Sequence, residues 1–265
     1  MGLGAYTAAA LYVHFGVEPW LGIFAAIAVA TAAGCAIGYL GFRFGVKGVY
    51  FALLTIAVAE FTRILFDHFG WVGGSSGLFL PVANRADNDL LSLRGSPTMF
   101  YYVILFLTAA AFVLVHALMR TRMGYYWLAI REDQDAAQAV GVAVFRYKLA
   151  AVALSAAMTA VGGVFYAFYY NNLYPHSIFS MHRSIEIILG PIIGGLGTLF
   201  GPIIGALVLT LTGETLSVLT EDLDADGIKA LVYGIVLLLI VYLRPAGIWP
   251  WLRRYLIRDG EGGES

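Results

Sequence analysis

Apolar side chains fill this sequence in runs long enough to cross a membrane. A helix needs about 17–25 predominantly apolar residues to span the hydrocarbon core of a bilayer. Six runs meet or approach this length, the first of them being short: 3–16, 20–41, 48–66, 99–119, 148–170 and 228–244. The pattern predicts an all-α integral membrane protein, a polytopic helical bundle of about seven or eight spans.

A further apolar stretch, 184–217, is interrupted near its middle by the glycine-rich residues 194–202. Each half is short for a full crossing, because a straight helix rises only about 1.5 Å per residue. We therefore expect an interrupted or re-entrant helix pair. Two short crossing helices and a pair that turns back at the glycines both stay open.

Lysine and arginine residues are divided unevenly between the two sides of the predicted bundle. If the loop 120–148 is cytoplasmic, eleven lie inside, namely Arg43, Lys47, Arg120, Arg122, Arg131, Arg146, Lys148, Arg244, Arg253, Arg254 and Arg258. Four lie outside, namely Arg85, Arg94, Arg183 and Lys229. This orientation also places four acidic residues outside, Glu221, Asp222, Asp224 and Asp226. Because cytoplasmic loops carry the excess of positive charge, the bias sets the orientation.

The composition agrees with a lipid environment. The 265 residues are 60% hydrophobic and 12% charged, with a mean hydropathy of +0.80, whereas soluble domains carry about 25% charged residues. The net charge of −1 gives no basic field for nucleic acid. The single cysteine, Cys35, can form no intrachain disulfide and is interpreted as a small packing residue.

Small residues recur at the spacing of helix contacts within the apolar runs. They are Gly34 and Gly38, then Ser155, Thr159 and Gly163, and then Gly201 and Gly205. Small side chains let helix backbones approach closely, so that dispersion forces hold a bundle together in lipid. We expect helix–helix contacts at these positions, with the lining of a solute path as the alternative.

Two charges fall within a predicted span. Glu60 and Arg63 lie three residues apart on one helix face. A charge in hydrocarbon costs several kcal/mol unless it is paired or wetted. Two interpretations stay open, a structural ion pair between the two side chains and a polar lining of the solute path. The candidates for that path are Thr55, Glu60, Gly194, Gly195 and Gly197.

The longest inner loop predicts a short amphipathic helix outside the bilayer, over 131–141. Acidic residues precede an alanine-rich turn that closes at Gly141. Acids favour a helix N-terminus, and glycine favours the residue after a helix. The helix would present small apolar side chains to a partner, Ala136, Ala137 and Val140. A solvated connector without a partner is the alternative.

This loop also carries a resemblance to a known family. Residues 129–142, followed by 146–149, resemble the inner loop of LivM-type permeases, which are subunits of branched-chain amino acid ABC importers. Further segments match the same family in the same order, at 4–8, 48–55, 73–78 and 193–202. Members of the family usually have further spans before the segment that corresponds to 4–8. The resemblance therefore leaves open whether further spans precede residue 1.

The resemblance implies a permease subunit that moves branched-chain amino acids or similar small solutes across the plasma (inner) membrane of a bacterium or archaeon. We expect one transmembrane domain over 1–258, with a coupling loop at 120–147, and a disordered tail at 259–265. The residues implied in coupling to an ATPase are Arg131, Glu132, Asp133, Asp135, Ala136, Ala137 and Gly141. The implied partners are a second homologous permease subunit, two cytoplasmic ATPase subunits and an extracytoplasmic solute-binding protein. Other amino acids, urea or amides stay open as solutes.

The sequence lacks the motifs of several enzyme classes. It has no Gly-x-x-x-x-Gly-Lys-Ser/Thr phosphate loop, so we expect ATP to be bound by partner subunits only and the chain to carry no cofactor. No His-Glu-x-x-His metal motif is present. Residues 73–77 contain Gly-x-Ser-x-Gly, but a loop-like segment follows where a protease would need a helix. We expect no enzyme activity. A stand-alone channel or secondary transporter remains the alternative function.

Overall fold

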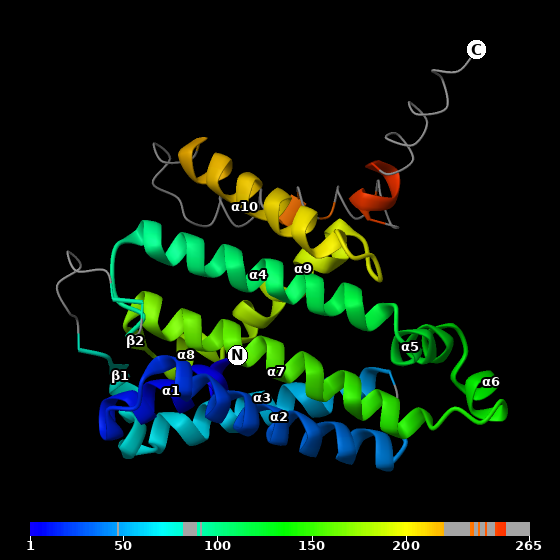
Figure 1. The fold of residues 1–265 in the computed structure, drawn as a ribbon, viewed down its shortest axis with the longest axis horizontal. Coiled ribbons are helices and arrows are strands. Elements are labelled where there is room, and N and C mark those ends of the chain that lie inside the picture. The colour runs from blue at the N-terminus through cyan, green and yellow to red at the C-terminus, as the bar shows by residue number, and fades with distance from the viewer. Residues whose placement is uncertain are drawn as a thin grey trace. The chain divides into compact units, whose positions relative to one another are not determined.

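The computed structural model describes most of the chain as α-helix (Figure 1). The described residues are 1–46, 48–81, 89–90, 92–219, 234–235, 238, 242 and 247–252. The predicted span 228–244 is therefore described only at a few positions. The predicted tail 259–265 lies outside the described residues, as do Lys47, Arg85, Glu221, Asp222, Asp224, Asp226, Lys229, Arg244, Arg253, Arg254 and Arg258.

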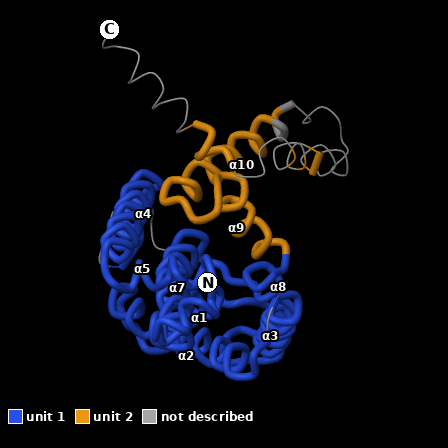
Figure 2. The backbone as a smooth tube through the Cα atoms, turned by 90° about the vertical axis from the view of Figure 1, so that its right-hand side faces the viewer, with its two compact units in different colours: residues 1–181 blue, residues 182–265 orange. Residues whose placement is uncertain are grey.

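The chain divides into two compact units, residues 1–181 and 182–265 (Figure 2). The helices of the first unit are α1 (Gly2–Phe15), α2 (Pro19–Arg43), α3 (Val49–His68), α4 (Pro97–Met119), α5 (Arg122–Glu132), α6 (Gln134–Ala139), α7 (Val144–Tyr170) and α8 (Pro175–Ile178). Two short 3₁₀ turns, η1 (Gly70–Val72) and η2 (Gly74–Ser76), follow α3. Strands β1 (Leu78–Phe79) and β2 (Asn172–Leu173) pair antiparallel.

Four of the described helices, α2, α3, α4 and α7, are long and apolar enough to cross a membrane. They fall on the runs predicted at 20–41, 48–66, 99–119 and 148–170. Helix α1 falls on the run 3–16, but its 14 residues rise only about 21 Å, less than a hydrocarbon core of about 30 Å. A predominantly helical architecture is confirmed, and the total number of spans stays a prediction.

Helix α7 is the centre of the first unit, since it packs extensively along both α2 and α1. Small residues bring these backbones together. A Cβ atom added to Gly34 of α2 would lie 2.9 Å from the Cβ of Ala156, and one added to Gly4 of α1 would lie 2.8 Å from the Ala160 backbone. The predicted contact at Gly34 is confirmed, and it allows the close approach that holds helices together in lipid.

Of the three positions of the contact row predicted on α7, one is buried within this chain. Gly163 is buried, but Ser155 and Thr159 are exposed in the described chain. The Thr159 hydroxyl instead donates to the carbonyl of Ser155 on its own helix, at 2.7 Å. The row that packs contains Ala156 and Ala160. Small residues lie on more than one face of α7. The i, i+4 spacing of small residues therefore could not predict which face packs against α1 and α2.

One end of the first unit is closed by buried aromatic and aliphatic side chains. Tyr6 is 1% exposed, and its hydroxyl donates to the carbonyl of Leu173 in β2 at 2.9 Å. The glycine-rich segment 73–77 forms tight turns beside this core. A Cβ on Gly77, whose φ is +85°, would lie 2.8 Å from the Leu173 carbonyl oxygen. Turn geometry therefore accounts for the glycine at position 77.

The second unit contains α9 (Met181–Gly194) and α10 (Gly201–Leu219). The predicted interruption of 184–217 is confirmed, because α9 ends at Gly194 and α10 begins at Gly201. A Cβ on Gly194 would lie 1.7 Å from the Gly201 carbonyl oxygen, and one on Gly205 would lie 1.8 Å from that of Gly190. The two helices thus touch through bare backbone. Whether the pair crosses fully or re-enters stays a prediction.

Candidate functional site

The inner loop forms a short helix whose start is fixed by one aspartate. Asp133 is extended, with φ −151°, and its carboxylate accepts hydrogen bonds from the backbone N–H groups of Asp135 and Ala136, at 2.9 and 3.0 Å. This is an N-cap, which satisfies N–H groups that have no partner within the helix. The same carboxylate sets a boundary between α5 and α6.

The predicted helix over 131–141 is therefore too long. Arg131 and Glu132 form the end of α5, and α6 begins only at Gln134. The physical reason is that the Asp133 side chain bonds the backbone ahead of it and holds its own residue out of the helical conformation. At the other end the prediction of Gly141 is confirmed, because Gly141 follows α6 with φ +89°, a conformation that favours glycine.

Helix α6 has one face buried against the chain and one face exposed. Ala137 is 4% exposed, so the prediction that it faces a partner is wrong. It lies on the inner face of α6, and its carbonyl accepts the N–H of Val142 at 3.1 Å. Val140 is 81% exposed, and Ala136 is exposed beside acidic Asp135. The surface open to a partner thus centres on Val140 and Ala136.

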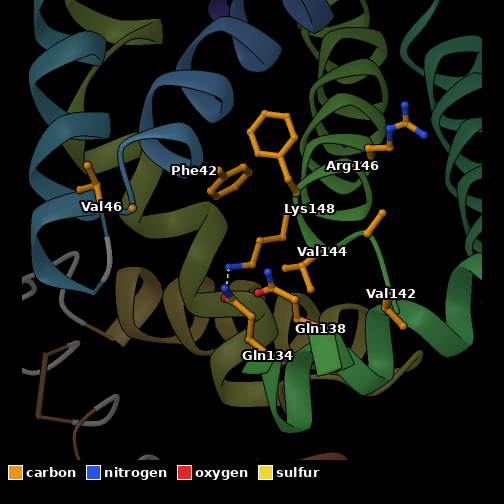
Figure 3. Close-up of a pocket in the computed structure, with 11 residues that line it drawn as sticks. Phe42, Val46, Gln134, Gln138, Val142, Val144, Arg146 and Lys148 are labelled. Carbon is orange, nitrogen blue, oxygen red and sulfur yellow. Dashed lines mark hydrogen bonds between the residues drawn. The ribbon is translucent and has the colours of Figure 1, made fainter. Parts of the chain in front are cut away.

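Two polar contacts attach the inner loop to the first turns of α7. The Lys148 ammonium donates to the side-chain oxygen of Gln134, the first residue of α6. The indole N–H of Trp127 in α5 donates to the carbonyl of Tyr147 at 2.8 Å. Figure 3 shows Lys148 extending from α7 to Gln134. A displacement of α5 and α6 would therefore be transmitted to the first turns of α7 through these two hydrogen bonds.

A pocket of about 490 Å³ lies between α6, the end of α2 and the start of α7 (Figure 3). Its polar lining comes from Gln134, Gln138, Arg146 and Lys148, and Phe42 contributes an aromatic wall. The Lys148 ammonium lies 5.4 Å from the centre of the Phe42 ring, within the range of a cation–π contact. The inner loop is thus seated on the helix ends and leaves a basic hollow beneath it.

The path candidates on α3 belong to an exposed helix that carries an ionic row. Arg63 Nε lies 3.0 Å from both carboxylate oxygens of Glu60, and Arg63 Nη1 lies 2.7 Å from Asp67 Oδ2. Glu60 and Arg63 therefore form an ion pair, and the row extends to Asp67. The Thr55 hydroxyl donates within its own helix, to the Ala52 carbonyl at 2.8 Å.

None of the described residues of α3 is buried. A helix of this kind presents Glu60 and its partners to whatever surrounds it. Lipid is a poor solvent for such a row, even when its charges are paired. The geometry is therefore suited to a surface covered by another protein chain or by water, and it fits both interpretations of Glu60 left open by the sequence.

The path candidates of the second unit lie at the junction of α9 and α10. Gly194 and Gly195 are buried and Gly197 is exposed. Gly195 and Gly197 adopt φ values of +121° and +75°, which favour glycine. The hydroxyl of Thr198 accepts the N–H of Gly201 at 3.0 Å and so satisfies a backbone donor at the start of α10. The glycines thus have a structural role in the turn and in the helix contact.

A family model described as "Branched-chain amino acid transport system / permease component" matches residues 1–241. The chain belongs to this permease family. The match confirms the resemblance drawn from the inner loop and the glycine-rich segments, and it covers α1 to α10.

Curated permeases of the family show similarity along nearly the whole chain. The "High-affinity branched-chain amino acid transport system permease protein LivM" of Escherichia coli K12 is 28% identical over 96% of this chain and 63% of its own length. LivM of Salmonella typhimurium LT2 is 27% identical, over 98% and 64%. The "Probable branched-chain amino acid transport permease protein LivH" of Methanocaldococcus jannaschii is 28% identical, over 96% and 83%.

The chain therefore spans less than two thirds of the length of the LivM relatives that it matches. No solved structure matches it. Its family membership rests on sequence, and its architecture rests on the helices described above.

Three features of this permease-family chain escaped prediction from the sequence. Asp67 completes the ionic row because it stands at i+4 from Arg63, a spacing that could have signalled the contact. The Gln134–Lys148 contact joins residues that are 14 positions apart, and no local pattern indicates it. The burial of Ala137 depends on the rotation of α6 about its axis, which six residues are too few to reveal.

Proposed function

We propose that this chain is a membrane-spanning subunit of an ABC importer for branched-chain amino acids or similar small solutes. The observation that carries the proposal is the family match over residues 1–241. The relatives are named as branched-chain amino acid transport permeases. The four span-length apolar helices support a place in the plasma membrane. Because the chain has no phosphate loop, ATP is bound by partner subunits only and the chain carries no cofactor.

The proposed assembly contains a second, homologous permease subunit. The similarity of this chain to relatives named both LivM and LivH supports such a pair. Two cytoplasmic ATPase subunits and an extracytoplasmic solute-binding protein complete it. The ionic row of α3, in which Glu60 is exposed and Arg63 is half-buried, suits a surface covered by the second permease or by water.

Coupling runs through α6 in this proposal. The ATPase contacts the exposed face of α6, at Val140 and Ala136. The push reaches α7 through the hydrogen bond between Gln134 and Lys148 and through that between Trp127 and Tyr147. Since α7 is the centre around which α1 and α2 pack, its displacement would change the packing of the first unit. Alternating access then follows from a local push at the membrane surface.

The test replaces Val140 by aspartate in the assembled transporter. A charge placed in an apolar contact should lower ATPase co-purification and ATP-driven leucine uptake by at least about tenfold. Ser76→Asp adds the same charge to an exposed turn far along the chain from α6 and should leave ATPase co-purification unchanged. Retention of the ATPase and of uptake in the Val140→Asp protein would reject docking at α6.

The alternative of a stand-alone channel or secondary transporter is not favoured. The matching family model describes a component of a transport system. Uptake by the purified chain in vesicles without any ATPase subunit or nucleotide would reverse this preference.

A further inference from the structure

The pocket beneath α6 has the chemistry of an anion site. Two cationic side chains line it, Arg146 and Lys148, and two amide side chains, Gln134 and Gln138, add hydrogen-bond donors. No carboxylate residue is among the lining residues that the structure describes. The nearest acidic residues in the sequence, Glu132, Asp133 and Asp135, do not line the pocket. The carboxylate of Asp133 instead caps α6.

Within the described part of the chain, neither cation of the pocket has a carboxylate within ion-pair distance. Lys148 donates to a neutral amide, that of Gln134, and its ammonium has three N–H groups. Figure 3 shows Gln138 and Lys148 turned toward the same space, while the Arg146 guanidinium points away from Gln134 and Gln138. Lys148 thus lies within the pocket and Arg146 at its rim. The Arg146 side chain is exposed, so a change of its rotamer would bring both cations to one anion.

The position of the pocket indicates which anion would reach it. The pocket lies where α2 ends at Arg43 and where α7 begins at Val144. Both helices are long enough to be spans, so their ends lie near the surface of the bilayer. The lysine and arginine bias places this surface on the cytoplasmic side. Phospholipid headgroups, whose phosphates are bound by basic pockets between helix ends, occupy that level.

An exposed aromatic side chain stands beside the pocket. Phe44, in the turn that follows α2, lies between the lining residues Phe42 and Gly45 in the chain and is 75% exposed. Aromatic side chains of this kind are enriched at the boundary between headgroups and acyl chains. A soluble phosphate would use only the cations and amides of the pocket. A phospholipid would also use the aromatic surface beside it.

We propose that this pocket binds the phosphate group of an anionic phospholipid headgroup. Lys148 and Arg146 supply the positive charge, Gln138 donates a hydrogen bond, and Phe42 with Phe44 contacts the lipid next to its headgroup. Occupancy of the pocket would brace α6 against the start of α7, on the route along which the coupling helix is proposed to act. Binding itself does not depend on the proposed function.

The test measures the thermal stability of the purified protein in phosphatidylcholine nanodiscs as phosphatidylglycerol is added. The unchanged protein should be stabilised in a saturable manner. Arg146→Gln should raise the half-saturating fraction of phosphatidylglycerol about tenfold, since one charged hydrogen bond contributes on the order of a factor of ten. Arg146 is exposed and makes no described ion pair, so its replacement leaves the fold intact.

Two further variants make the result decisive. Lys148→Gln should weaken the lipid effect as Arg146→Gln does, and Lys148→Arg should restore most of it. Arg122→Gln removes an exposed cation of α5 that does not line the pocket, and it should behave as the unchanged protein. If Arg122→Gln and Arg146→Gln shift the titration equally, the lipid effect is a general surface attraction and the proposal is overturned.

A third arm separates the two sources of phosphate. Inorganic phosphate added to phosphatidylcholine nanodiscs should give no stabilisation that depends on Arg146. Equal, Arg146-dependent stabilisation by inorganic phosphate would overturn the lipid as the ligand. Because the readout is stability in a defined lipid and involves neither ATPase nor uptake, its failure would leave the proposed transport function untouched.

Discussion

Helices α7 and α3 are both long and apolar enough to cross a membrane, yet they relate differently to the rest of the chain. Helix α7 packs along α1 and α2 and buries Ala160, Val164 and Ala167 almost completely. Helix α3 buries none of its residues and carries the row Glu60, Arg63 and Asp67. The comparison separates a helix whose contacts are satisfied within one chain from a helix whose surface requires another chain or water.

The largest effect is expected at the centre of the α7 packing. Gly163→Leu places a side chain where even a Cβ would lie 2.2 Å from the Met1 carbonyl oxygen. The expected loss of stability is about 3 kcal/mol or more, because neither backbone can move aside without breaking the helix contact. Thermal unfolding in detergent measures it.

The chain supplies a matched control at the next residue. A Cβ on Gly162 meets nothing within 4 Å, so Gly162→Leu should leave the unfolding temperature within a few degrees of the unchanged protein. Equal destabilisation by both leucines would contradict the packing face assigned to α7.

The second effect concerns the ionic row of α3. Arg63→Gln leaves Glu60 and Asp67 without their cation, so uptake should fall at least about tenfold. The triple variant Glu60→Gln/Arg63→Gln/Asp67→Asn, which removes all three charges, then distinguishes the two interpretations of this pair. Recovery of both assembly and uptake would show a structural pair. Recovery of assembly alone would show that the charges act in the solute path.

Much of this comparison could be foreseen from the sequence. Apolar runs located α2, α3, α4 and α7, since a lipid-exposed helix must be apolar over its length. The glycines at 194–201 marked the break before α10, because glycine both turns the chain and allows backbone contact. These features depend only on local composition, so one sequence was sufficient to find them.

The rotation of a helix about its axis could not be foreseen. Ser155 and Thr159 have the same spacing as Ala156 and Ala160, and only the neighbouring helices decide which row is buried. The same limit applies to Ala137 of α6. The start of α6 was misplaced for a different reason, because Asp133 can occupy a helix or cap one, and here it caps.

A smaller effect tests that cap. Asp133→Ala removes the acceptor for two backbone N–H groups and should destabilise α6 by about 1 kcal/mol, whereas Asp133→Asn should retain most of the cap. Hydrogen exchange at the amides of Asp135 and Ala136 should accelerate about fivefold in the alanine variant. Unchanged exchange at both amides would show that α6 starts without help from Asp133.

The smallest effect is expected on the exposed face of α7. Ser155→Ala should change the stability of the isolated chain by less than about 0.5 kcal/mol, since the side chain is exposed. Thermal unfolding of Ser155→Ala and Gly163→Leu, measured side by side, gives the smallest and the largest expected loss of stability on α7. A loss as large as that of the glycine variant would place Ser155 in the core after all.

The side of the membrane on which α6 lies tests the account most directly. A chain with Cys35→Ser and Val140→Cys has a single thiol, at the exposed residue that directly follows α6. In sealed, right-side-out vesicles a membrane-impermeant maleimide should fail to label it, and should label it fully once the vesicles are opened. Labelling of the intact vesicles from outside would place α6 on the external face, where no cytoplasmic ATPase can reach it.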